Sequence, residues 1–155
     1  MSGIVGGAGS KSGVIGTTEL DYEEGTLGTE YANGILTPAS GTSITCNSLY
    51  TIAYTKIGNA IFITGQVAVT GIDSPTGIKL NLPFVCKSGS RAYRSGSGMV
   101  TYNSDFGPSA TTIGCLTRDG TSFAEIYGLI DNAAYVNPVP EVSDHYTFSF
   151  NYITE

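Results

Sequence analysis

The chain has 155 residues, carries only 13% charged residues and has a formal net charge of −6. Ordinary soluble domains carry about 25% charged residues, and disordered chains combine high charge with few aromatic residues, whereas this chain has 10 Tyr, 6 Phe and 21 Gly. The composition indicates one β-rich domain with many turns. It argues against nucleic acid as a partner, because a negative chain without a basic run repels a polyanion. It also argues against a membrane partner, because no apolar run approaches the roughly 20 residues that span a bilayer.

Residues 1–34 are predicted to form an extended N-terminal arm. They show neither helical periodicity nor sustained strand alternation, and the glycines that recur through them weaken any regular element. Four carboxylates then fall within six positions, at Glu19, Asp21, Glu23 and Glu24. A glycine-rich terminus is ordered only when it is tied down. We therefore expect this arm to be held by its own domain or by a neighbouring chain.

From about residue 42 the pattern changes to strands and turns. Three segments alternate clearly, and the apolar residues of each share one face: Ile61, Ile63, Val67 and Val69; Ile78, Leu80, Leu82 and Phe84; and Tyr146, Phe148, Phe150 and Tyr152. Residues 71–77 are predicted to be a turn-rich loop, and the Asp-Gly pair within 118–121 predicts a hairpin. Seven or eight short strands without a helix predict a β-sandwich or jelly roll over residues 35–155.

The sequence carries no recognisable catalytic or cofactor motif. Lys11 follows Gly6 out of the register that a phosphate-binding loop needs, and no helix follows. The only histidine, His145, lies on the polar side of a strand, and no nucleophile-elbow motif is present. The three cysteines, Cys46, Cys86 and Cys115, lie in apolar contexts and are predicted to be buried free thiols. We expect no enzyme activity, no cofactor and no metal.

Two groups of residues remain candidates for contacts. The acidic cluster could be a catalytic pair, a cation site, a solvated linker or a docking patch. Catalytic carboxylates need a rigid frame and a calcium loop needs a spacing that is absent here, so we interpret it as a solvated or partner-contacting patch. Four tyrosines are candidates for a subunit contact or a carbohydrate-stacking platform: Tyr93, Tyr102, Tyr127 and Tyr135.

Residues 9–26, GSKSGVIGTTELDYEEGT, closely resemble a segment of phage virion proteins, especially tail-fibre-type proteins of phages of aquatic bacteria. A Tyr-Thr-Lys-Ile-Gly segment at 54–58 and a Leu-Pro-Phe element at 82–84 follow in the order seen in that family. The resemblance covers roughly residues 9–84. The chain departs from the family at Leu27, where Trp is common, and this loses a large aromatic anchor.

The resemblance implies a structural virion protein that is usually trimeric, has a compact β-sandwich or jelly-roll tip, and has no enzyme activity. Two roles stay open. In the first, a homotrimeric decoration (cement) protein stabilises the head by binding the major capsid protein or another virion protein. In the second, a tail-fibre adhesin tip recognises a host surface glycan or protein. A chain of 155 residues is short for a shaft plus an anchoring domain, which favours decoration.

Either role places the protein in the virion, assembled in the host bacterial cytoplasm. The arm is then a docking segment in which main-chain hydrogen bonds supply affinity, and its acidic residues face a basic surface on a neighbour. Its predicted contact residues are Lys11, Ile15, Glu19, Leu20, Asp21, Tyr22, Glu23 and Glu24.

Overall fold

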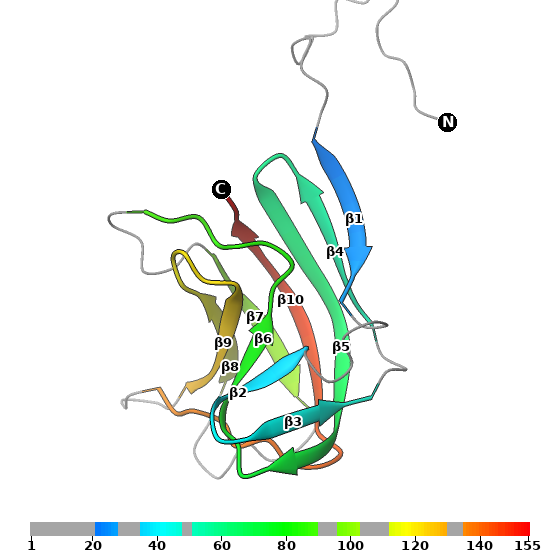
Figure 1. Cartoon of the computed structure of the whole chain (residues 1–155), viewed down its shortest axis with the longest axis vertical. Coiled ribbons are helices and arrows are strands. Elements are labelled where there is room, and N and C mark those ends of the chain that lie inside the picture. The colour runs from blue at the N-terminus through cyan, green and yellow to red at the C-terminus, as the bar shows by residue number, and fades with distance from the viewer. Residues whose placement is uncertain (1–20, 28–34, 48–50, 90–95, 103–111, 130–134) are drawn as a thin grey trace, which may run out of the picture.

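The computed structural model describes residues 21–27, 35–47, 51–89, 96–102, 112–129 and 135–155. The regular structure in these ranges is entirely β-strand (Figure 1). In chain order the strands are β1 (Tyr22–Thr26), β2 (Leu36–Ser40), β3 (Ser43–Cys46), β4 (Ile52–Ile57), β5 (Ala60–Asp73), β6 (Thr76–Asn81), β7 (Gly96–Tyr102), β8 (Thr112–Thr117), β9 (Phe123–Leu129) and β10 (His145–Ile153).

Nine of these strands form one antiparallel sheet in the order β1-β4-β5-β10-β7-β8-β9-β6-β2, and β3 pairs with the end of β5. The sheet is strongly curled into a half-barrel, with its core on the inner face (Figure 1). The prediction of an all-β fold is confirmed. No helix within the described ranges has the length and hydropathy to cross a bilayer.

The long strand β5 pairs with two different strands along one of its edges. Its first half pairs with β4 and its last residues pair with β3, while β10 runs along the opposite edge. The change of neighbour occurs near Gly65, whose φ is 144°. A Cβ at Gly65 would lie 2.3 Å from the carbonyl oxygen of Thr51 and 2.5 Å from the Cα of Ile52. Only glycine allows β4 and β5 to approach this closely here.

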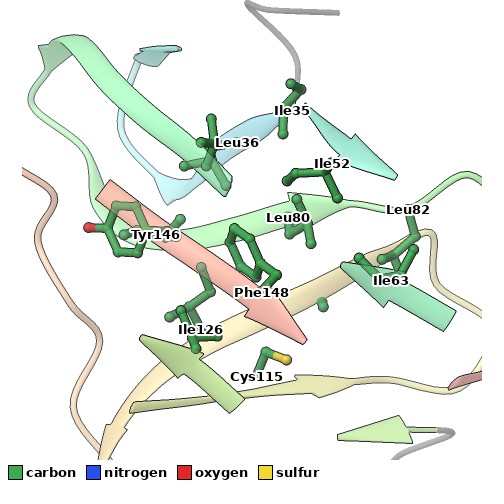
Figure 2. Close-up of a cluster of buried hydrophobic side chains, with 14 of the residues drawn as sticks. Ile35, Leu36, Ile52, Ile63, Leu80, Leu82, Cys115, Ile126, Tyr146 and Phe148 are labelled. Carbon is green, nitrogen blue, oxygen red and sulfur yellow. The ribbon is translucent and has the colours of Figure 1, made fainter. Parts of the chain in front are cut away.

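The inner face carries the hydrophobic core, to which both halves of the curled sheet contribute. Figure 2 shows Ile52 of β4 and Phe148 of β10 in one cluster with Ile126 of β9. The alternation read from the sequence is confirmed, because all four predicted inward residues of β10 are buried, as are the following residues of the other two segments: Ile61, Ile63, Val67, Val69, Ile78, Leu80 and Leu82. Each such side chain contributes about 1.5–3 kcal/mol when it is fully buried.

Polar groups that enter the core have hydrogen-bond partners. The Tyr152 hydroxyl donates to the carbonyl of Phe84 at 3.2 Å and accepts from its amide at 3.3 Å. The Thr117 hydroxyl donates to the carbonyl of Gly96 at 3.0 Å. The three cysteines are buried and form no disulfide, as predicted. Satisfied groups of this kind lower the cost of burying polar atoms.

Two details of the predicted strand layout were wrong. Residues 71–77 are not an open loop, because β5 continues to Asp73 and β6 starts at Thr76. The end of β5 stays extended because β3 pairs with it. The count of seven or eight strands missed the short strands β1 and β2. By contrast, the hairpin predicted at 118–121 is confirmed between β8 and β9, with Gly120 at a φ of 69°.

Candidate functional site

The described parts of three segments noted in the sequence, residues 21–26, 54–58 and 82–84, meet at one corner of the sheet. Strand β1 comes from the acidic segment, β4 contains most of the Tyr-Thr-Lys-Ile-Gly segment, and Phe84 ends the Leu-Pro-Phe element. The register places Glu23 opposite Lys56 and Gly25 opposite Tyr54. We call Asp21, Glu23, Gly25, Tyr54, Lys56 and Phe84 the arm anchor.

Ionic and aromatic contacts hold the arm anchor together. The Lys56 Nζ lies 2.5 Å from Asp21 Oδ2 and 5.5 Å from the centre of the Phe84 ring. The Tyr54 hydroxyl donates to Glu23 Oε1 at 2.6 Å. The Tyr54 ring packs edge-on against the Phe84 ring, with 5.4 Å between the ring centres. The hydrogen bond to the Glu23 carboxylate raises the pKa of Tyr54 above its usual value. Two carboxylates of the acidic cluster therefore have partners within the chain.

Gly25 fits a position that a larger residue would disturb. A Cβ there would lie 2.4 Å from Tyr54 Cε1 and 2.5 Å from the Tyr54 hydroxyl oxygen. An aromatic ring that covers a glycine on a neighbouring strand is a known device for stabilising a sheet edge. Two main-chain bonds complete the junction: the Gly58 amide donates to the Asp21 carbonyl, and the Leu27 amide donates to the Ile52 carbonyl, each at 2.7 Å.

The remaining arm residues are partly described. Leu27 is half-buried and packs against the core. Tyr22 is 55% exposed on the outer face, where its hydroxyl donates to Glu24. Lys11, Ile15, Glu19 and Leu20 lie outside the described residues. A cavity of about 450 Å³ lies beside the arm anchor and is lined by Thr26, Leu27, Ile35, Tyr54, Asn81, Leu82 and Pro83.

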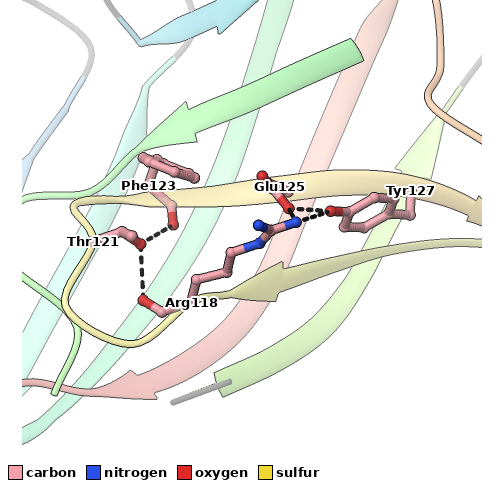
Figure 3. Close-up of polar contacts among 5 residues, drawn as sticks. All are labelled: Arg118, Thr121, Phe123, Glu125 and Tyr127. Atoms are coloured by element: carbon pink, nitrogen blue, oxygen red, sulfur yellow. Dashed lines mark hydrogen bonds and ion pairs between the residues drawn. The ribbon is translucent and has the colours of Figure 1, made fainter. Parts of the chain in front are cut away.

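The structure brings together two of the four candidate tyrosines. The rings of Tyr127 and Tyr135 lie 5.5 Å apart, and the Tyr127 hydroxyl donates to Glu125. Arg118 binds both groups, with its Nη2 3.1 Å from the Tyr127 hydroxyl and 2.7 Å from the Glu125 carboxylate (Figure 3). Partial burial, followed by the hydrogen bond to Glu125, raises the pKa of Tyr127.

Of the other two candidate tyrosines, only the main chain of Tyr102 is described. Tyr102 lies on β7, two strands away from β9, at the position that pairs with Tyr146. Tyr93 lies outside the described residues. A subunit contact or carbohydrate platform made by these four tyrosines therefore stays a prediction.

A hollow on the outer face was not foreseen from the sequence. It has a volume of about 400 Å³ and crosses β4, β5, β10 and β7 around Phe62, which is 48% exposed. Its polar lining residues are Thr55, Thr64, Ser97, Ser149 and Asn151. The alternation of β5 already places Phe62 on the outward side. An aromatic residue on an otherwise polar face was the signal that could have marked this site.

The structure offers little for catalysis. Within the described ranges, no three His, Cys, Asp or Glu side chains are grouped so that they could hold a metal ion. His145 Nδ1 lies 3.5 Å from Gln66 Nε2 on the outer face of β10 and β5. The predicted absence of enzyme activity and of a cofactor stays a prediction.

Comparisons with family models, with curated proteins and with solved structures found no match for this chain.

Proposed function

We propose that this chain is a non-enzymatic structural protein of a bacteriophage virion, and that it acts as a homotrimeric decoration protein that stabilises the head. The arm anchor is the observation that carries this proposal. Three segments that resemble virion proteins lie far apart in the sequence, yet Asp21 contacts Lys56, and Tyr54 contacts both Glu23 and Phe84. The resemblance therefore concerns one physical unit rather than scattered residues.

The arm anchor has a mechanical role in this proposal. It fastens β1 to the edge of the sheet, and so it fixes where the preceding arm is tethered. An edge strand also presents main-chain donors and acceptors to a neighbouring chain. Three arms on one trimer would bind together with more affinity than one arm alone, because the second and third contacts form at a high effective concentration.

The proposal extends to the shape of the domain. The inner-face residues of β5 and β10 pack in one core with those of β6 and β9. We infer that the curled sheet serves as the β-sandwich or jelly-roll body of the virion protein, with its two halves acting as the two layers. A curled sheet whose halves share a core provides the same rigid support for an arm as two separate layers do.

The test is to remove residues 1–20, which leaves β1 and the arm anchor in place. Light scattering after size exclusion measures the oligomer, and sedimentation with phage heads that lack the protein measures attachment. We expect the shortened chain to stay a trimer and to lose attachment. Replacing Glu24 by lysine in the full chain tests the charge of the patch while leaving the Glu23–Tyr54 hydrogen bond of the arm anchor in place. Attachment that survives the deletion, or a full chain that is monomeric at assembly concentrations, contradicts the proposal.

The second candidate function is a tail-fibre adhesin tip. The outer-face hollow around Phe62 favours it, because a half-exposed ring among hydroxyl and amide groups is suited to ligand recognition. Immunogold labelling of particles separates the two roles. Labelled heads support decoration, whereas labelled tail tips support adhesion and contradict decoration.

A further inference from the structure

Two rows of paired residues build the outer-face hollow. The pairings run across β4, β5, β10 and β7, and they give a longer row, Thr55–Phe62–Asn151–Ser97, and a shorter row, Ala53–Thr64–Ser149. Neighbouring strands lie about 4.8 Å apart, so the longer row spans about 14 Å. That length suits an extended ligand of a few ring units rather than a single small molecule.

The hollow exists because its residues are small around one large ring. Alanine, serine, threonine and asparagine surround Phe62. Gly98 lines the hollow only with its main chain, because it pairs with the inward residue Phe150 and its missing Cβ would lie on the inner face, 2.1 Å from the Cβ of Phe150. The depression therefore follows from the small outward residues of the four strands.

The polar groups around Phe62 are available to a ligand. Within the described part of the chain, no side-chain hydrogen bond is made by the hydroxyls of Thr55, Thr64, Ser97 and Ser149 or by the amide of Asn151. Each hydroxyl can donate one hydrogen bond and accept two, and the amide can do both. Within the described ranges, these hydroxyl and amide groups therefore surround the exposed Phe62 ring and have no side-chain hydrogen bonds of their own.

The chemistry of this lining selects an uncharged partner. None of the described residues that line the hollow is Asp, Glu, Lys, Arg or His. An ionic ligand would find no counter-charge, whereas a ligand with many hydroxyls would find a donor or acceptor on every side. A sugar ring combines such hydroxyls with an apolar face that can lie on an aromatic ring.

We propose that this hollow binds a neutral oligosaccharide, with one sugar ring on Phe62 and its hydroxyls bonded to the surrounding hydroxyls and to Asn151. This inference deepens the second candidate function, which rests on the same hollow, and it uses a surface separate from the arm anchor. It is therefore independent of whether the protein decorates the head.

The full-length protein is first applied to an array of neutral and acidic glycans. The best neutral ligand is then titrated by calorimetry against the wild type and against Phe62→Ala and Asn151→Ala. Ile153→Ala is the matched control, because Ile153 is an outward residue of β10 that is 37% exposed and does not line the hollow. Circular dichroism confirms that each variant is folded.

We expect binding to neutral glycans, and we expect Phe62→Ala to raise Kd about tenfold or more, which is about 1.4 kcal/mol. The control should change Kd less than about twofold. The proposal is overturned if no neutral glycan binds, if only acidic glycans bind, or if Phe62→Ala binds like the wild type. It is also overturned if Phe62→Ala dissociates the oligomer while the wild type binds no glycan, because the face is then a contact between copies.

Discussion

Replacing Gly25 by alanine tests whether the arm anchor holds β1 on the sheet. The added Cβ would lie 2.4 Å from Tyr54 Cε1, well inside contact distance, so the ring has to move. Moving it breaks the 2.6 Å hydrogen bond from Tyr54 to Glu23 and the edge-on contact with Phe84.

The expected cost follows from these contacts. An exposed hydrogen bond of this kind contributes about 1 kcal/mol, and an aromatic pair about 0.5–1.5 kcal/mol. Alanine restricts the unfolded chain more than glycine does, and this offsets about 0.4–1 kcal/mol of the lost free energy of unfolding. The net loss of unfolding free energy is about 0.5–2 kcal/mol. For a chain of this length each kcal/mol lowers Tm by about 2–4 °C, so we expect a fall of about 1–8 °C.

The assay combines thermal unfolding with hydrogen exchange, and Gly114→Ala is the matched control. A Cβ at Gly114 meets its nearest neighbour, the Gly98 carbonyl oxygen, at an ordinary 3.5 Å. In Gly25→Ala the amides of Gly58 and Leu27, which bond between β1 and β4, should lose protection before the rest of the sheet does. The reasoning is refuted if both variants show the same Tm and the same protection at these amides.

Three further predictions concern packing, charge and pH. Gly98→Ala should lower the free energy of unfolding in urea by about 1–3 kcal/mol, because its Cβ would lie 2.7 Å from the main-chain Cα of Phe150 and the backbone has to shift. A midpoint equal to that of Gly114→Ala contradicts this. Asp21→Asn should lower the free energy of unfolding by less than about 1 kcal/mol in low salt and by no measurable amount in 1 M NaCl, because its ion pair with Lys56 is exposed on the Asp21 side. A larger loss that salt does not reduce argues against the pairing. Burial raises the pKa of Cys46 to about 11 and of Cys115 to about 12, from a usual 9.0. Above about pH 9 these two thiols ionise in the unfolded chain but stay neutral in the folded chain. The free energy of unfolding is therefore unaffected by them below about pH 9 and falls by up to about 3 kcal/mol per pH unit from pH 9 to 11. A Cys46→Ala, Cys115→Ala double variant whose free energy of unfolding falls just as steeply with pH refutes this assignment.

The inner faces of the long strands could be predicted because burial imposes a period of two on the local sequence. Tyr146 and Phe148 alternate with polar residues, and the structure buries both. Strand β1 has no such local signal, since the partners of Glu23 and of the adjoining Asp21 are Tyr54 and Lys56, more than thirty positions away. Strand β2 contains Pro38, which lacks an amide donor and is tolerated because β2 is an edge strand.

The candidate sites were harder to predict from the sequence than the strands, because they depend on contacts between residues far apart in the chain. The sequence suggested a platform of tyrosines, but Tyr102 pairs with Tyr146 while Tyr127 contacts Tyr135 on another part of the sheet. The hollow around Phe62 takes small residues from four strands that are distant along the chain. Each contributes an unremarkable serine, threonine or asparagine, so the site exists only once the strands are paired.

The position of β10 has a consequence for biosynthesis. It follows all the other described strands along the chain, yet it lies in the middle of the sheet between β5 and β7 (Figure 1). Because the ribosome synthesises the chain from the N-terminus, the edges of β5 and β7 that pair with β10 stay unpaired until residues 145–153 emerge. Exposed edges of this kind invite pairing with other nascent chains. Native folding of the described sheet therefore ends with a closing step, in which β10 pairs with both β5 and β7.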